Sequence, residues 1–164
     1  MLFRSRAPEH RFAVRELTTA LTSSSSSLER KRMAAEALGE LCAPQAVASL
    51  AEMLGSVDGV LAEKCHRALM RITFADFGFS ERRWSNWWQA NRHRHRIEWA
   101  LDSVNHRKED IRRAAIDELR RMVGDAVAWP AGPLDHKQRK EIRRRVEDWW
   151  ASEGRLLNPV VEID

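Results

Sequence analysis

The sequence predicts an all-α fold, arranged as a right-handed α-solenoid of helix pairs with two inserted Trp-rich helices. Two observations predict it. Apolar residues recur with a period near 3.6 along almost the whole chain, and no stretch alternates like a strand for long. In addition, three stretches superimpose on one another: RMAAEALGEL at 32–41, EKCHRALMRI at 63–72 and RRAAIDELRRM at 112–122.

The helices follow from the periodicity and from the residues that start and stop them. Prolines at 8 and 44 suit first-turn positions, where a missing N–H costs nothing. Ser26 with Glu29, and Asp135 with Gln138, have the spacing of capping boxes. We therefore expect helices at 8–21, 28–42, 44–54, 59–73, 80–91, 95–104, 109–123 and 137–152.

Superposition of the three stretches aligns leucines at 38, 69 and 119, and small residues at 34, 65 and 115. Small residues let neighbouring helices approach while leucines fill the space between them. A second type of helix interleaves with the first and aligns Val14, Val47 and Ile97. The third stretch comes later in the chain than the spacing of the first two predicts, and the segment 74–92 accounts for the surplus.

The stretch RKRMAAEALGELCAPQAVASLAEML at 30–54 resembles a HEAT-like repeat of the type found in phycobilisome lyases. The resemblance implies stacked helix pairs and a single HEAT-like repeat domain over 1–164, in which 153–164 form a non-helical C-terminal tail. One departure from the family pattern concerns the turn before Pro44. The family usually places Asp before this proline, whereas Cys42 and Ala43 precede it here, so the cap of the following helix is in question.

Tryptophans gather in RRWSNWWQANRHRHRIEW at 82–99 and again in RRVEDWW at 144–150, which matches 82–88. On a helix the first three tryptophans share one face, whereas the apolar face that begins at Ile97 is rotated away from it. The chain must therefore bend between about Asn91 and His95. A part that occurs twice in one chain indicates a structural role, and the predicted aromatic anchors are Trp84, Trp87, Trp88, Trp99, Trp149 and Trp150.

The same 82–99 segment carries the basic residues that are candidates for binding a partner: Arg82, Arg83, Arg92, His93, Arg94, His95 and Arg96. We expect the tryptophans to hold the helices together and the guanidinium groups to face outward. Three interpretations remain open. The patch is a solvated structural surface, a docking site for an acidic protein surface, or a nucleic-acid site that combines arginines with stacking rings.

Nothing in the sequence predicts catalysis, a metal site or a cofactor. His93 and His95 lack a further ligand at helical spacing, and His66 falls at a packed position. Cys42 and Cys65 have no CxxC spacing and are expected to be reduced and buried. No Gly-rich phosphate loop or hydrolase motif is present. Absence of a long apolar run predicts a cytoplasmic protein with no membrane contact.

These observations favour a non-catalytic scaffold or adaptor module that binds another protein through a helical-repeat surface. The alternative is a nucleic-acid-binding HEAT-like module that uses the patch at 82–99. Asp148 beside Trp149 superficially resembles the arrangement in HEAT-like alkylpurine DNA glycosylases. However, the chain is short for that family, and its formal net charge is only +4, so glycosylase activity is improbable.

Overall fold

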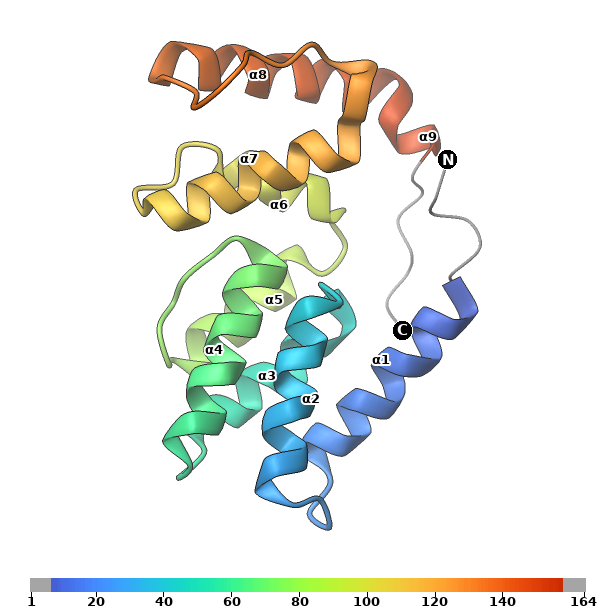
Figure 1. The fold of residues 1–164 in the computed structure, drawn as a ribbon, viewed down its shortest axis with the longest axis vertical. Helices are drawn as coiled ribbons and strands as arrows, with labels where there is room; N and C mark the ends of the chain where they lie inside the picture. The colour runs from blue at the N-terminus through green and yellow to red at the C-terminus, as the bar shows by residue number, and fades with distance from the viewer. Residues whose placement is uncertain (1–6, 158–164) are drawn as a thin grey trace. The chain divides into compact units, whose positions relative to one another are not determined.

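The structure is a computed structural model that describes residues 7–157, with side chains from Glu9 onward. These residues are all-helical and contain no strand (Figure 1). Their contacts group into two compact units: a first unit of 7–72 and 76–91, and a second unit of 73–75 and 92–157. Each unit is described by itself, and the single domain over 1–164 stays a prediction.

The first unit contains the helices α1 (Ala7–Thr22), α2 (Leu28–Glu40), α3 (Val47–Glu52), α4 (Gly59–Thr73) and α5 (Glu81–Asn91). Helix α1 packs on α2, and α3 packs on both α1 and α5 (Figure 1). Short 3-10 turns, Pro44–Ala46 and Met53–Gly55, flank α3. The single helix expected at 44–54 is therefore a short α-helix between two 3-10 turns. Its first turn begins at Ala43, which offers no side-chain cap.

One of the two expected capping boxes is present. Asp135 accepts a hydrogen bond from the Gln138 backbone N–H at 2.7 Å, and the Gln138 side chain accepts one from the Asp135 N–H at 2.9 Å. The other is wrong by one residue. Ser27, not Ser26, caps α2, because its Oγ accepts the Arg30 N–H at 3.2 Å while its backbone is extended.

Helices α2 and α4 approach each other very closely at Gly39. A Cβ atom at this glycine would lie 3.0 Å from the Cα and Cβ atoms of Ala68. Leu38, which precedes Gly39, and Leu69, which follows Ala68, are two of the leucines that the superposition aligned. Both are fully buried. Small residues here therefore set the distance between the two helices.

Helix α2 ends in a Schellman motif. The Ala43 N–H donates to the Leu38 carbonyl at 3.2 Å, and the Cys42 N–H donates to the Gly39 carbonyl at 3.1 Å. This geometry puts Cys42 at a φ of 49°, in the left-handed region that favours glycine. Cys42 is half-buried and Cys65 fully buried, and burial raises the pKa of the Cys65 thiol to about 12.

Replacing Cys42 should reveal the cost of this left-handed conformation. We expect Cys42→Gly to be more stable than Cys42→Ala by about 1 kcal/mol, because both lose the thiol but only alanine keeps a Cβ at positive φ. Urea unfolding of the two variants measures the difference. Equal stabilities would contradict the assignment of residue 42 as the left-handed cap.

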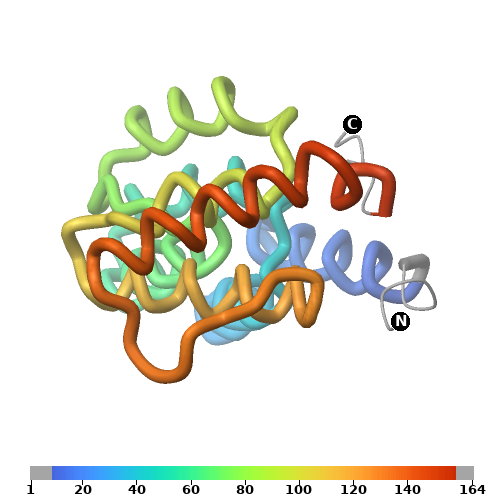
Figure 2. Tube along the Cα trace, turned by 90° about the horizontal axis from the view of Figure 1, so that it is seen from above, coloured from blue at the N-terminus to red at the C-terminus, as the bar shows by residue number. Residues whose placement is uncertain are grey.

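The second unit contains α6 (Arg96–Ser103), α7 (Glu109–Val123) and α8 (His136–Trp149), followed by a π-helical turn (Trp150–Gly154) and α9 (Arg155–Leu157). Helix α6 packs on α7 and on α8. Between α7 and α8 the chain makes a 3-10 turn at Gly124–Ala126 and then a loop, orange in Figure 2. Phe74 belongs to this unit because its carbonyl accepts the buried Ser103 hydroxyl at 2.7 Å.

The non-helical tail predicted for 153–164 is wrong for 153–157, which are helical. Residues 158–164 lie outside the described residues. Within this helical segment the rings of Trp149 and Trp150 lie against the backbone of Gly154. A Cβ at this position would lie 2.6 Å from Cε3 of Trp150. Glycine, which has no Cβ, fits this position without displacing the two rings.

Most of the positions that superposition of the sequence aligned are buried in both units; in the set of Leu41, Ile72 and Met122, only Ile72 is fully buried and the other two are half-buried. In four of the aligned sets, every residue is at most 5 % exposed. These sets are Leu38, Leu69 and Leu119; Ala34, Cys65 and Ala115; Val14, Val47 and Ile97; and Leu21, Leu54 and Val104. Each unit therefore has its own apolar core, built from corresponding helix positions.

Candidate functional site

Helix α5 is fixed to the first unit by Trp84. This ring is fully buried, its Nε1 donates to the Gly78 carbonyl at 2.8 Å, and Phe77 meets it edge-on at a centroid distance of 4.9 Å. Gly78 has a φ of 60°, which turns the loop so that its carbonyl faces the indole. Trp84 thus joins the loop before α5 to the helix itself.

A second tryptophan, Trp150, is tied to the start of α6. Its ring is 3 % exposed, its Nε1 donates to Oε1 of Glu98 at 3.0 Å, and the His95 ring lies 4.6 Å away between centroids. Arg155 also donates to Oε1 of Glu98, at 3.3 Å. Glu98 therefore links the π-helical turn and α9 to α6.

The two tryptophan segments have the same pattern of burial. Trp84 and its counterpart Val146 are fully buried, whereas Trp87 and its counterpart Trp149 are half-buried. The remaining anchors, Trp88, Trp99 and Trp150, are at most 6 % exposed. Rings in these places are available for packing and offer little surface to a base or another ligand.

Two of the predicted partner-binding arginines form ion pairs with carboxylates of the second unit. Arg96 is largely buried: its guanidinium pairs with Glu118 and lies 4.6 Å above the centroid of the Phe74 ring. Arg94 donates to Glu98 at 3.2 Å and to Asp102 at 2.7 Å. The expectation that the guanidinium groups face outward is wrong for Arg96, because Glu118 on α7 and the Phe74 ring hold its side chain inside the second unit.

The carboxylates of this region remain charged despite their burial. Burial raises the pKa of Glu98, but hydrogen bonds from Trp150 and Arg94 outweigh it and hold the pKa below its ordinary value. Burial likewise raises the pKa of Glu118, and its contacts with Arg121 and Arg96 bring the pKa below the ordinary range. A network of paired charges therefore stabilises the junction of α6 with α7.

His95 has a structural position rather than an exposed one. It is the N-cap of α6, where its Nδ1 accepts the Ile97 N–H at 3.3 Å. Burial lowers the pKa of His95; Glu98 opposes this shift and Arg96 adds to it. The neutral ring, which can accept the capping hydrogen bond, is thus the favoured form.

The lowered pKa predicts a dependence of stability on pH. Because the folded pKa lies below the ordinary value of 6.5, the unfolded chain binds a proton first as the pH falls. The stability from His95 is present above pH 6.5 and is lost as the pH falls toward the folded pKa. Urea unfolding between neutral and mildly acidic pH should show a shallower loss in His95→Phe than in the parent. His93→Phe, an exposed neighbour, should keep the full loss, and identical slopes in both variants would contradict the assignment.

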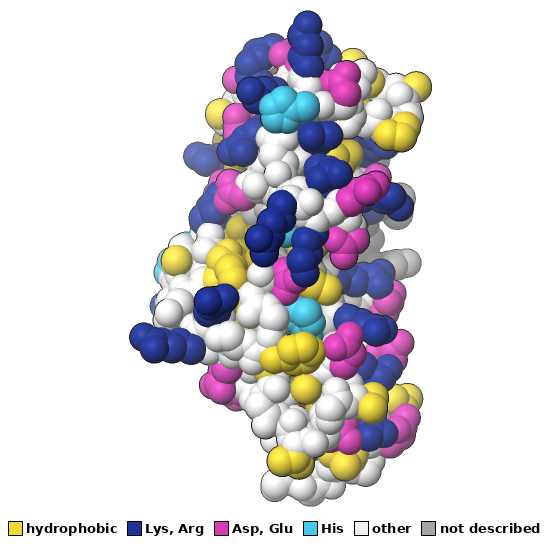
Figure 3. All heavy atoms as spheres, turned by 90° about the vertical axis from the view of Figure 1, so that its left-hand side faces the viewer, with side chains coloured by type: hydrophobic (Ala, Val, Ile, Leu, Met, Phe, Trp, Pro, Cys, Tyr) yellow, Lys and Arg dark blue, Asp and Glu magenta, His cyan; other side chains and the backbone are white. Residues whose placement is uncertain are grey.

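The other predicted binding residues remain at the surface. Arg82 and Arg83 lie on α5 in the first unit, and Arg92 and His93 begin the second unit. All four residues are exposed, and none forms an ion pair with a carboxylate of residues 9–157. Basic and acidic side chains otherwise intermingle on the face drawn in Figure 3. The division between the units falls after Asn91. Arg82 and Arg83 therefore belong to one unit, and Arg92 and His93 belong to the other.

A histidine–carboxylate pair that the sequence does not reveal lies in the first unit. His66 Nε2 and Asp76 Oδ1 are 2.8 Å apart, and Phe79 covers the imidazole at a centroid distance of 4.8 Å. The same Asp76 oxygen accepts the Gly78 N–H at 2.8 Å. The pair thereby orders the loop that presents Gly78 to Trp84. No three His, Cys, Asp or Glu side chains of the described residues are placed to hold a metal ion.

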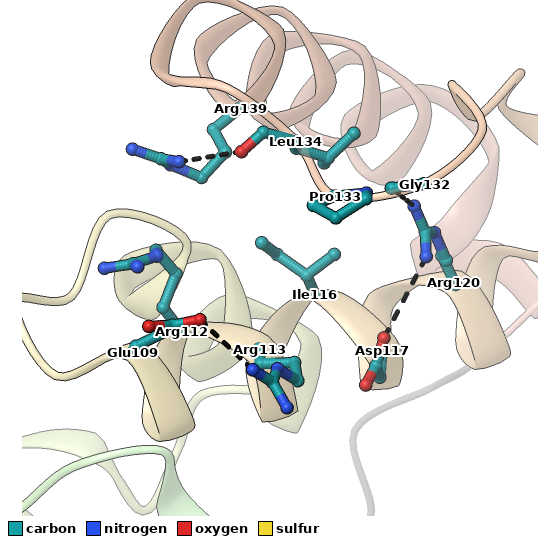
Figure 4. A pocket seen from close by; sticks show the side chains of 10 residues that line it. All are labelled: Glu109, Arg112, Arg113, Ile116, Asp117, Arg120, Gly132, Pro133, Leu134 and Arg139. Atoms are coloured by element: carbon teal, nitrogen blue, oxygen red, sulfur yellow. Dashed lines mark hydrogen bonds and ion pairs between the residues drawn. The ribbon is translucent and has the colours of Figure 1, made fainter.

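The second unit also contains a cleft of about 280 Å³ between α7 and the loop leading into α8, which we name the α7–α8 cleft. Ile116 points from α7 toward Pro133 and Leu134, and these three residues give the cleft an apolar centre (Figure 4). The remaining lining residues are Glu109, Arg112, Arg113, Asp117, Arg120, Gly132 and Arg139.

Backbone carbonyls position three arginines of the cleft. Arg112 donates to the His106 carbonyl at 2.9 Å, and Arg139 donates to the Leu134 carbonyl at 2.8 Å. Arg120 donates to the Gly132 carbonyl at 3.2 Å and lies over the Trp129 ring, and its nearest carboxylate, on Asp117, is 4.0 Å away. The fourth arginine, Arg113, pairs with Glu109 at 3.1 Å, whereas neither Arg112 nor Arg139 has an ion pair within the described part of the chain.

Sequence reasoning overlooks the α7–α8 cleft because no local pattern marks it. Arg112 and Arg120 are two turns apart on one helix, and Arg139 follows a loop of irregular structure. The predicted patch at 82–99 is more conspicuous because its arginines are close together in sequence. The structure neutralises part of that patch and leaves uncompensated charge in the cleft instead.

Fold and site together define an all-helical protein with buried aromatic anchors and exposed cationic surfaces. No helix of residues 7–157 combines the length and apolar character needed to cross a bilayer. Comparison with protein-family models, with curated proteins and with solved structures finds no significant match. The HEAT-like resemblance of 30–54 therefore stays a prediction.

Proposed function

We propose that the chain is a non-catalytic scaffold or adaptor module, acting in the cytoplasm, that binds another protein through the outer surface of HEAT-like helix pairs. Repeats of this kind present long helix faces that suit recognition of a macromolecule. The repeated burial of corresponding leucines and small residues supports this architecture. The partner that fits best has an acidic surface.

The observation that carries the proposal is the separation of aromatic from cationic side chains. The rings at 84, 88, 99 and 150 are buried, whereas Arg82, Arg83 and Arg92 are exposed and form no ion pair with a described carboxylate. Exposed cations of this kind steer association with an acidic surface and select among partners. Their interior counterparts, such as Arg96, serve folding.

The nucleic-acid alternative is less well supported by the same observation. Single strands bind to grooves in which exposed rings stack on successive bases next to cationic side chains. Of the three rings that follow Arg82 and Arg83 on α5, Trp84 and Trp88 are at most 6 % exposed and Trp87 is half-buried. Phosphate contacts would remain, but on α5 stacking on a tryptophan would be confined to the exposed part of Trp87.

Cross-linking in the native host, followed by reconstitution with the purified partner, tests the proposal. We expect a protein that cross-links to the described helices and binds the purified chain with a rate that falls as salt is raised. Reversing the charges of Arg82, Arg83 and Arg92 to Glu should slow this association. Nuclease-sensitive capture, with tight and steeply salt-dependent binding of single-stranded DNA by the purified chain, would overturn the proposal in favour of nucleic-acid binding.

A further inference from the structure

We propose that the α7–α8 cleft is the peptide-binding site of the module and takes an acidic segment in which a carboxylate side chain neighbours an apolar one. This inference rests on the proposed function, because it names the site and the chemistry of the partner. It assigns peptide binding to residues that are distant in sequence and come together in one cleft, and leaves the exposed arginines at 82, 83 and 92 the role of steering association.

Charge is the first argument. Arg112 donates to one backbone carbonyl, and Arg139 donates to one backbone carbonyl and to the Asn105 side chain. These neutral acceptors hold the two guanidinium groups in place without neutralising their charge. A guanidinium has five N–H donors in a fixed fork, so each retains donors for a carboxylate. Figure 4 shows these two side chains at one end of the cleft and Arg120 at the other. An anionic side chain entering the end of Arg112 and Arg139 would meet two positioned cations without an ion pair, whereas at the other end Arg120 is shared with Asp117 at 4.0 Å.

The centre of the cleft supplies the second argument. Ile116 is largely buried beneath the hollow, and Pro133 and Leu134 face it across the opening (Figure 4). An apolar side chain placed there would be removed from water between the two cationic ends. The volume of about 280 Å³ is near the lower limit for ligand pockets and suits a few side chains rather than a whole small ligand.

The acidic residues of the lining distinguish a peptide from a nucleic acid. Glu109 and Asp117 line the same cleft as four arginines, and Glu109 lies 3.1 Å from Arg113 and Asp117 4.0 Å from Arg120. Their carboxylates would repel the continuous negative charge of a phosphate backbone, whereas they can accept hydrogen bonds from the N–H groups of a peptide. The alternation of cations, apolar surface and carboxylates matches a chain that has acidic side chains, apolar side chains and backbone donors.

The test is an NMR titration of the whole ¹⁵N-labelled chain with a short peptide of alternating leucine and glutamate. We expect the largest shifts at the amides of Ile116, Gly132 and Leu134, with binding that weakens as salt is raised. A peptide with glutamine in place of every glutamate should bind about tenfold more weakly or not at all. Arg112→Glu and Arg139→Glu should each weaken binding of the acidic peptide about tenfold, whereas Arg107→Glu, exposed and outside the lining, should change it much less.

Further outcomes separate this inference from the proposed function. Arg112→Gln and Arg139→Gln remove the charge less drastically, and weaker binding by these variants with unchanged melting would support the inference. If the acidic peptide binds but shifts residues of α5 instead, and binding is lost in Arg82→Glu, the cleft is wrong while protein binding stands. If oligothymidylate binds and no peptide does, both proposals are overturned.

Discussion

Trp84→Ala is expected to lower the free energy of unfolding by about 3–5 kcal/mol, the range for removing a large ring from a core. Trp84 is fully buried, and its loss would leave a cavity beside Phe77. It would also remove the hydrogen bond to the Gly78 carbonyl. Urea unfolding followed by circular dichroism measures the change.

Two variants keep this prediction testable if Trp84→Ala does not fold. Trp84→Phe keeps an apolar ring without the N–H donor, and we expect an intermediate loss. Trp87→Ala truncates a half-buried indole on the same helix, so its loss should be about 1–2 kcal/mol. Equal losses for Trp84→Ala and Trp87→Ala would show that Trp84 has no special anchoring role.

Arg96→Met is expected to cost about 3 kcal/mol, because it removes one partner of a largely buried ion pair while keeping an unbranched side chain against Phe74. Glu118 would then retain only its contact with Arg121 among the pairs described. Equilibrium unfolding in urea measures the loss.

The matched control is Arg92→Met, the same substitution at an exposed arginine four residues earlier. It should change stability by less than about 0.5 kcal/mol. In the double variant Arg96→Met, Glu118→Leu, both charges are absent, so part of the loss should be recovered. A loss at Arg92 as large as that at Arg96 would contradict the buried pair and restore Arg96 as a candidate surface residue.

Much of the helical structure is predictable from the sequence because helix signals are local. The expected helix at 109–123 coincides with α7, and the Asp135–Gln138 box is present as predicted. Errors arise where several local signals compete. Ser26 and Ser27 both precede α2, and only backbone geometry decides which of them caps the helix.

The candidate site is less predictable because its charges are sorted by tertiary contacts. Arg92 and Arg96 are residues of the same type only four positions apart. Arg92 is nevertheless exposed, whereas Arg96 pairs with Glu118 on a neighbouring helix. No local pattern states that α7 brings a carboxylate to Arg96. For the same reason, nothing local predicts that Arg139 shares a cleft with Arg112.

The contact between Gly154 and the indoles of Trp149 and Trp150 has a consequence for how this sequence can vary. Any side chain at residue 154 would collide with both indole rings. The overlap could be relieved only if the rings moved away. Descendants of this chain that keep both tryptophans should therefore keep the glycine. Those that lose it should show a smaller residue at 149 or 150, so the three positions should change together.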